Sequence, residues 1–169
     1  NPPEEAPIAK ATSGAHRHHY ACILDWTGFE AWLDKIEHAP LTSLDTETTS
    51  LDPFAARLVG ISLAVTPGEA AYIPLGHDYA GAPTQLELET VLKRLKPWLE
   101  SERHAKIGQN LKYDQHVFAN HGIALAGIAH DTLLQSYVLE SGKDGARGHD
   151  LGRLALRHLG LATIAYEDL

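Results

Sequence analysis

Two acidic side chains, Asp45 and Glu47, lie close together in a segment whose pattern otherwise predicts a strand. Residues 41–52 read LTSLDTETTSLD, with apolar and small polar residues alternating at a period of two. On a strand, Asp45 and Glu47 share one face about 7 Å apart, and Leu44 and Thr46 point to the other. No Lys or Arg lies within nine residues on either side of the pair.

A carboxylate pair in a segment of this kind favours a bound cation. Burying carboxylates is unfavourable unless a positive charge neutralises them, and hard oxygen ligands suit Mg²⁺ or Mn²⁺. The alternative is that Asp45 and Glu47 end the strand and are simply solvated there. From this segment alone, both interpretations stay open.

A third acid, Asp114, is predicted on the core-facing side of a helix. Leu111, Val117 and Phe118 mark the apolar stripe of that helix, and Asn110 stands at its expected N-cap. An acid in line with such a stripe is unusual. It meets a partner, meets a metal, or lies at the exposed end of the stripe.

The surrounding pattern predicts an α/β fold. Strands are expected at 20–24, 58–65, 70–75 and 104–109, in addition to the acidic strand. Pro67 and Gly68 occupy the centre of a type II turn, so the second to fourth strands form an antiparallel meander. The strand at 104–109 follows a helix, which makes it parallel to its neighbour. The prediction is a mixed sheet, an antiparallel meander plus a parallel strand, flanked by helices.

Several residues are expected to cap these helices. Thr27 with Glu30, and Thr84 with Glu87, have the spacing of capping boxes. Asp131 is expected to cap a helix that uses Leu133, Leu134, Tyr137 and Val138, and Asp150 begins a last helix.

Composition limits the class of protein. The 169 residues are 44% hydrophobic and 21% charged, which is typical of a soluble globular domain. The net charge of −8 argues against broad electrostatic binding of nucleic acid, but it does not exclude an enzyme that grips a phosphate backbone through metal. The single Cys22 and the absence of a transmembrane-length apolar run predict a cytoplasmic protein with no membrane partner. Nothing indicates an obligate oligomer.

In a mixed sheet, Asp45, Glu47 and Asp114 can converge at one edge. Three neighbouring carboxylates do not all stay ionised without compensating charge. Two divalent ions about 4 Å apart would neutralise them and create a site for phosphoryl transfer.

Two motifs in this order resemble the 3′→5′ exonuclease domain of bacterial DNA polymerase I, a D-E-D-D exonuclease. They are residues 45–52 (DTETTSLD) and 108–114 (GQNLKYD), and residues 71–74, 77–79 and 127–132 add to the likeness. The resemblance covers residues 20–169 and implies a ribonuclease-H-like fold. It also implies hydrolysis of the 3′-terminal phosphodiester of single-stranded or frayed DNA, for proofreading, with two Mg²⁺ or Mn²⁺ ions.

The resemblance also implies residue roles. Asp45, Glu47 and Asp114 would be the catalytic metal ligands, and Leu51 would wedge against the terminal bases. The other residues expected to contact the substrate are Thr46, Gln109, Asn110, Tyr113 and Tyr166. Residues 1–19 are then expected to be a linker, and the polymerase domain of the same parent chain would be the partner.

The family's third motif, Tyr-x-x-x-Asp, has no counterpart among these residues. None of the six Tyr residues is followed by Asp four positions later, and the related His-x-x-x-x-Asp form is absent as well. The exonuclease domain at 20–169 is therefore expected to be truncated at its C-terminal end and impaired in hydrolysis.

Two alternatives carry different functions. One is a stand-alone RNA-trimming exonuclease of the same superfamily, which a comparison of DNA with RNA substrates would identify. The other is a catalytically silent domain that only braces a polymerase. The presence of Asp45, Glu47 and Asp114 argues against loss of activity through loss of those ligands.

Overall fold

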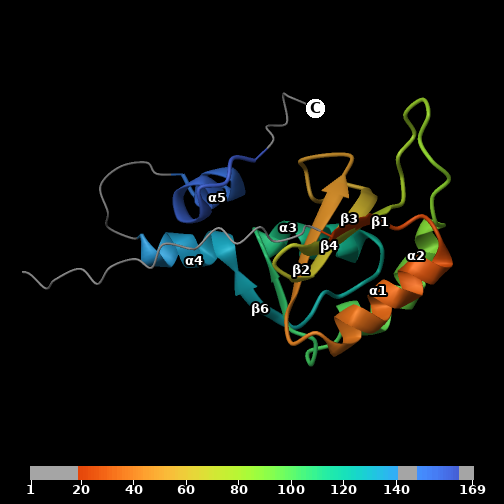
Figure 1. The fold of residues 1–169 in the computed structure, drawn as a ribbon, viewed down its shortest axis with the longest axis horizontal. Helices are drawn as coiled ribbons and strands as arrows, with labels where there is room; N and C mark the ends of the chain where they lie inside the picture. The colour runs from red at the N-terminus through yellow and green to blue at the C-terminus, as the bar shows by residue number, and fades with distance from the viewer. Residues whose placement is uncertain (1–18, 141–147, 164–169) are drawn as a thin grey trace, which may run out of the picture.

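A six-stranded mixed sheet with the order β1-β4-β3-β2-β5-β6 forms the centre of the fold (Figure 1). The computed structural model describes residues 19–140 and 148–163. The strands are β1 (His19–Cys22), β2 (Thr42–Thr48), β3 (Leu58–Thr66), β4 (Glu69–Pro74), β5 (Lys106–Gly108) and β6 (Ile128–Asp131). The helices are α1 (Trp26–His38), α2 (Leu88–Leu99), α3 (Leu111–Asn120), α4 (Thr132–Leu139) and α5 (Leu151–Leu159).

The central strands have the predicted antiparallel order. β2 pairs antiparallel with β3, and β3 pairs antiparallel with β4 through a turn in which Gly68 has a φ of 86°. That positive φ is the conformation a type II turn demands at its third position. β5 lies parallel to β2, as expected for a strand reached through a helix. The predicted meander and parallel strand are confirmed.

The two outer strands differ from expectation. β1 begins at His19, inside the range predicted as linker, and pairs parallel with β4. β6 was not predicted; it pairs parallel with β5 and brings Asp131 opposite Gly108. Four residues that include the exposed His130 are too short and too polar to produce a strand pattern.

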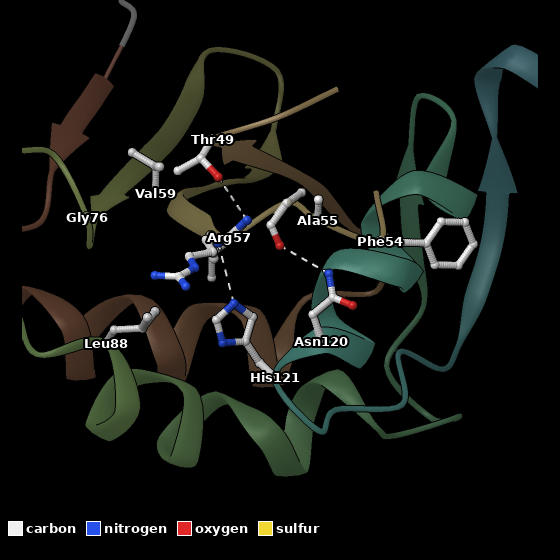
Figure 2. Close-up of a pocket in the computed structure, with 11 residues that line it drawn as sticks. Thr49, Phe54, Ala55, Arg57, Val59, Gly76, Leu88, Asn120 and His121 are labelled. Carbon is white, nitrogen blue, oxygen red and sulfur yellow. Dashed lines mark hydrogen bonds between the residues drawn. The ribbon is translucent and has the colours of Figure 1, made fainter. Parts of the chain in front are cut away.

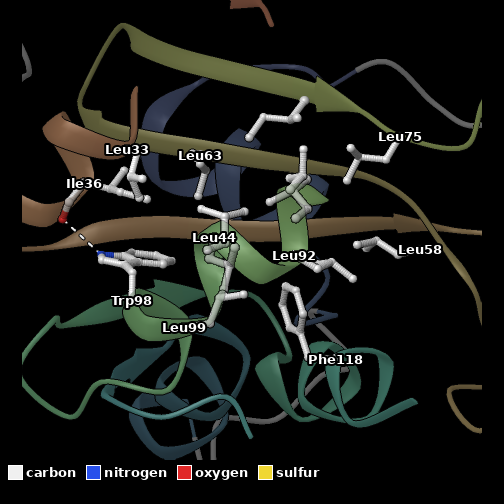
Figure 3. Close-up of a cluster of buried hydrophobic side chains, with 14 of the residues drawn as sticks. Leu33, Ile36, Leu44, Leu58, Leu63, Leu75, Leu92, Trp98, Leu99 and Phe118 are labelled. Carbon is white, nitrogen blue, oxygen red and sulfur yellow. Dashed lines mark hydrogen bonds between the residues drawn. The ribbon is translucent and has the colours of Figure 1, made fainter. Parts of the chain in front are cut away.

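The hydrophobic core lies between the sheet and helices α1, α2 and α3. Figure 3 shows Leu44 of β2 and Leu58 of β3 among side chains from the helices. The Trp98 indole N–H donates to the carbonyl of Ile36 at 3.0 Å, which joins α2 to α1. Each such fully buried side chain contributes about 1.5–3 kcal/mol through removal of apolar area from water. The face of β2 that packs into the core is therefore the one opposite Asp45 and Glu47.

Both predicted capping boxes are wrong. α1 is capped by Asp25, whose Oδ1 accepts from the Gly28 N–H at 2.8 Å, so Thr27 already lies inside the helix. α2 is capped by Glu87, which accepts from the N–H groups of Glu89 and Thr90. In both cases a nearby carboxylate takes the cap, because its charge also interacts favourably with the helix N-terminus.

Helices α4 and α5 lie together at the left of Figure 1, beyond β6 and away from α1 and α2. Their large apolar side chains are more exposed than those of the core; these include Leu134, Tyr137, Val138, Leu139, Leu151, Leu156 and Leu159. Asp131 and Asp150 cap these two helices as predicted. No helix in residues 19–140 or 148–163 is long and apolar enough to cross a membrane.

Candidate functional site

β2 presents Asp45 and Glu47 to solvent on one face and buries Thr42, Leu44 and Thr46 on the other. This is the alternation that the sequence predicts for a strand with one face in the core. The two acids are therefore held by a strand whose register is fixed by the burial of its other residues.

α3 holds Asp114 against the edge of β2. β5 ends at Gly108, and a Cβ added there would lie 2.5 Å from Leu111 Cδ2 and 2.6 Å from the Leu44 carbonyl oxygen. Only glycine lets the helix start this close to the strand. Asp114, in the first turn of α3, is left 2% exposed.

A hydrogen bond joins the two acidic elements directly. The hydroxyl of Thr46 donates to Oδ1 of Asp114 at 2.6 Å. β5 pairs with β2 only as far as Ser43, so beyond that point the edge of β2 has no strand beside it. The backbone N–H of Thr46 also interacts favourably with the Asp114 carboxylate.

The surroundings of Asp45 and Asp114 disfavour the charged forms of their carboxyl groups. Burial raises the pKa of Asp114 to about 7; the hydrogen bond from Thr46 opposes that shift, and the charge of Asp45 adds to it. Although the side chain of Asp45 reaches solvent, partial desolvation by the surrounding protein raises its pKa, and repulsion from Glu47 adds to that rise. No Lys or Arg within the described ranges forms an ion pair with any of the three.

The chemistry of these donors fits a divalent ion. All three are hard oxygen ligands, they repel one another, and one is buried without a counter-charge. In the part of the chain that the structure describes, no three His, Cys, Asp or Glu side chains gather as a preformed metal site. The acids instead interact in pairs, Asp45 with Glu47 and Asp45 with Asp114.

Leu51 lies at the tip of the segment that follows β2 and is 96% exposed. The Tyr113 hydroxyl of α3 donates to the carbonyl of Ser50 and also contacts the hydroxyl of Thr48. At the other end of α3, Asn120 Nδ2 donates to the carbonyls of residues 53 and 56, at 2.8 and 3.1 Å. The helix that carries Asp114 thus holds this segment at both ends.

Sequence reasoning did not identify a cavity of about 750 Å³ beneath this segment (Figure 2). Figure 2 shows Arg57, Asn120 and His121 around it, and the Leu58 N–H donates to His121 Nε2 at 3.4 Å. The cavity contains none of the three acids. No motif marks it, because its lining comes from β3, α2 and the end of α3 as well as from the segment.

The remaining predicted substrate residues have different surroundings. Gln109 is already engaged: its Nε2 donates to the His149 carbonyl at 2.7 Å, and its Oε1 lies 2.5 Å from the Thr132 hydroxyl. Asn110 is exposed and has a left-handed backbone with a φ of 60°. Its side chain makes no cap hydrogen bond, contrary to the prediction. Tyr166 lies outside the described residues.

Comparison with known proteins identifies relatives over most of the chain. The 3′-5′ exonuclease family matches residues 20–169. DNA polymerase I of Pseudomonas aeruginosa is 52% identical over 152 residues, covering 89% of this chain and 16% of the relative. DNA polymerase I of Rhizobium leguminosarum is 39% identical over 167 residues, covering 89% and 16%. The chain thus spans about a sixth of the length of these relatives.

Solved structures share the fold at lower identity. The POL domain of Pol1 from M. smegmatis, in complex with DNA primer-template and dNTP, has a TM-score of 0.66 and 22% identity, covering 88% of this chain and 24% of that one. Escherichia coli RNase D has a TM-score of 0.62 and 17% identity, covering 88% and 36%. Brucella melitensis NrnC with bound Mg²⁺ has a TM-score of 0.57 and 21% identity, covering 88% and 62%.

The sequence matches, the mixed sheet shared with these nucleases and the acid pair on β2 agree with one another. The chain belongs to the 3′-5′ exonuclease family, as the exonuclease domain of a bacterial DNA polymerase I.

Proposed function

We propose that this domain removes nucleotides from the 3′ end of DNA in a reaction that depends on divalent metal. The observation that carries the proposal is the hydrogen bond between Thr46 and Asp114. It links the helix acid to the strand that bears Asp45 and Glu47, so acids far apart in the sequence form one electronegative site in which no Lys or Arg of the described residues pairs with them.

Asp45, Glu47 and Asp114 would hold the metal. Two Mg²⁺ or Mn²⁺ ions there would lower the pKa of an attacking water and neutralise charge on the phosphate and leaving oxygen. The protein contributes the position of the acids: β2 fixes two of them, and Thr46 holds the third through its hydroxyl. The raised pKa values of Asp45 and Asp114 make the protein receptive to added positive charge.

The segment around Leu51 supports binding of a single-stranded 3′ end. A leucine that is 96% exposed on a segment fixed by Tyr113 and Asn120 is available to a ligand without rearrangement. Leu51 would wedge against the terminal bases, since apolar contact with a base needs no sequence information. Asn110 and Tyr113 would position the terminal nucleotides. Thr46 and Gln109 would assist indirectly, through their hydrogen bonds to the Asp114 carboxylate and to the His149 carbonyl.

The relatives support a role for this domain within a longer protein. Both matched polymerases are several times longer than this chain. We infer that a polymerase domain of the same parent chain delivers a frayed 3′ end to this site, which is proofreading. The 169 residues contain no Tyr-x-x-x-Asp, so by themselves they would hydrolyse DNA slowly and bind metal weakly.

The test compares two forms of the chain. One is the 169-residue chain; the other is extended past Leu169 with the corresponding segment of the P. aeruginosa polymerase. Both are incubated with single-stranded DNA that carries a free or a blocked 3′ end, with Mg²⁺ or with chelator. We expect Mg²⁺-dependent shortening from the free 3′ end, fast in the extended form and slow in the shorter one.

Two outcomes would contradict the proposal. If Asp45→Ala in the extended form leaves the shortening rate unchanged, the acids on β2 are not the catalytic site. If RNA of the same sequence is shortened and DNA is not, the domain is an RNA-trimming enzyme instead. Equal rates of the two forms would refute only the predicted impairment.

A further inference from the structure

One carboxylate, that of Asp131, caps two helices at once. Its Oδ1 accepts from the N–H groups of Asn110 at 3.0 Å, Leu133 at 2.9 Å and Leu134 at 3.3 Å. Its Oδ2 accepts from the Leu111 N–H at 2.9 Å. Asn110 and Leu111 begin α3, and Leu133 and Leu134 lie in the first turn of α4. Asp131 therefore fixes the start of the helix that carries Asp114 from a position 20 residues further along the chain.

The sheet brings Asp131 to this position. β6 pairs with β5 so that Asp131 lies opposite Gly108, and α3 begins three residues after Gly108. The hydroxyl of the next residue, Thr132, lies 3.1 Å from the Gly108 carbonyl oxygen. Asp131 and Thr132 thus both attach the end of β6 to the turn between β5 and α3.

This arrangement leaves the side chain of Asn110 without a capping role. Asparagine at an N-cap normally accepts a hydrogen bond from the first turn of its own helix. Here the N–H groups of Asn110 and Leu111 are bonded to Asp131, and Asn110 has a left-handed backbone. Within the described residues, its amide makes no hydrogen bond and borders a cavity of about 400 Å³ that Gln109, Tyr137 and His149 also line.

We propose that Asp131 is a positioning residue of the nuclease site, and this rests on the function proposed above. By accepting from the N–H groups of Asn110 and Leu111, Asp131 holds Asn110 in its left-handed conformation, in which the Asn110 amide does not cap α3 and is available for the terminal nucleotide. It also fixes the first turn of α3, in which Tyr113 and Asp114 lie. Asp131 itself contacts neither substrate nor metal, because its two oxygens are engaged by backbone N–H groups.

A purely structural cap would behave differently. If Asp131 served only the stability of α4, its loss would lower stability and leave the kinetics of the folded protein unchanged. Asp25 provides the matched control, because it caps α1 through Gly28 and lies outside the proposed site. Asp25→Ala removes a cap of the same chemistry from a helix that carries none of the site residues.

The experiment is a double-mutant cycle in the extended form. Asp131→Ala, Asn110→Ala, the double variant and Asp25→Ala are assayed for kcat and KM on a single-stranded DNA oligonucleotide. We expect Asp131→Ala to lower kcat/KM by about ten- to a hundredfold, the range for residues that orient a ligand. Asn110→Ala should raise KM in the parent, but change it less than twofold in the Asp131→Ala background. In that background the backbone of Asn110 is no longer held by Asp131, so its amide is no longer presented to the substrate.

Asp131→Asn is expected to have an intermediate effect. It keeps an acceptor at one oxygen and loses the other, so kcat/KM should fall between the parent and Asp131→Ala. Amide hydrogen exchange at Asn110 and Leu111 should accelerate in both Asp131 variants and not in Asp25→Ala. Additive effects of Asp131→Ala and Asn110→Ala, or kinetics of Asp131→Ala equal to those of Asp25→Ala, would overturn the proposal.

The two proposals fail in distinguishable ways. If the parent shows no shortening of DNA that depends on Asp45, the nuclease function fails, whatever hydrogen exchange shows. If that activity is present and the cycle is additive, only the positioning role of Asp131 fails.

Discussion

Among the residues that the structure describes, two charged side chains, Lys106 and Asp114, are buried, and their surroundings are opposite. Lys106 is fully buried, yet its Nζ donates to the carbonyls of Ser101 at 3.2 Å and His104 at 2.9 Å. The same nitrogen lies 4.5 Å from the centre of the Trp98 ring. Its positive charge is thus matched by carbonyl dipoles and by the face of an aromatic ring.

Asp114 is compensated only by hydrogen-bond donors from Thr46 and from its own backbone. Burial outweighs these donors, and the charge of Asp45, which has the same sign, raises the pKa of Asp114 further. The fold therefore satisfies one buried charge internally and leaves the other to be satisfied from outside. The difference supports the proposal that Asp114 binds a cation, whereas Lys106 has a structural role.

The largest expected effect is on the rate of DNA shortening, and it distinguishes Asp114 from Lys106. In the extended form, Asp114→Asn should lower the rate of DNA shortening by more than about a hundredfold, beyond the range for outer-shell partners of a metal ligand. Lys106→Met should leave kcat/KM of the folded protein within about twofold, because Lys106 lies outside the site. Initial rates at saturating Mg²⁺ measure both, and a comparable loss in the two variants would erase the distinction.

The next effect is on stability and pH in the metal-free chain. Burial raises the pKa of Asp114 from 3.8 to about 7. The contribution of this shift to the free energy of unfolding is therefore complete below pH 4 and is lost as pH rises through 7. The difference corresponds to at most about 4 kcal/mol. We expect Asp114→Asn to remove that fall, as measured by urea unfolding between pH 4 and 8.

Lys106 should show the opposite sign. Burial lowers its pKa from 10.5 to about 8. The contribution of this shift to the free energy of unfolding is therefore present above pH 10.5 and is lost as pH falls through 8. Lys106→Met should remove a change of at most about 3 kcal/mol between pH 7 and 10.5. If the slopes of unfolding free energy against pH are the same in the variant and the parent, Lys106 does not titrate as described.

A smaller effect tests the link between strand and helix. Thr46→Val keeps the shape of the side chain and removes the donor to Asp114, so stability should fall by about 1 kcal/mol. DNA shortening in the extended form should fall about tenfold, because Asp114 loses a partner that orients it. Thr46→Ser restores the hydroxyl and should recover most of the rate; failure to do so would point to packing instead.

The smallest effect on stability belongs to Leu51. Leu51→Ala should change the free energy of unfolding by less than about 0.5 kcal/mol, since the side chain is almost fully exposed. Its loss should still weaken binding of a single-stranded oligonucleotide severalfold, measured by fluorescence anisotropy with Ca²⁺ present. Unchanged affinity would remove Leu51 from the substrate site.

The elements that carry the acids could be predicted from the sequence because their signals are local. Alternation in residues 41–52 gave the face shared by Asp45 and Glu47, and Pro67-Gly68 gave the turn of the meander. The stripe of Leu111, Val117 and Phe118 placed Asp114 on the inner side of α3. Each of these depends on residues within about ten positions of one another.

The contacts that complete the site could not be predicted, because they depend on pairing between distant segments. Thr46 and Asp114 are separated by 68 positions. Asp131 was predicted to cap α4, but its bonds to α3 depend on the β5–β6 register, and β6 was missed. The carboxylate caps at Asp25 and Glu87 were missed because Thr with Glu at the right spacing fits the capping-box pattern equally well.

The central claim is that Asp45, Glu47 and Asp114 share divalent metal, and Mn²⁺ binding tests it most directly. Electron paramagnetic resonance of free Mn²⁺ gives the dissociation constant for the 169-residue chain and for its Asp45→Ala, Asp114→Asn and Asp25→Ala variants at pH 8. We expect the first two variants to weaken binding by at least about tenfold and Asp25→Ala to leave it unchanged. Equal dissociation constants in all four proteins would contradict the claim.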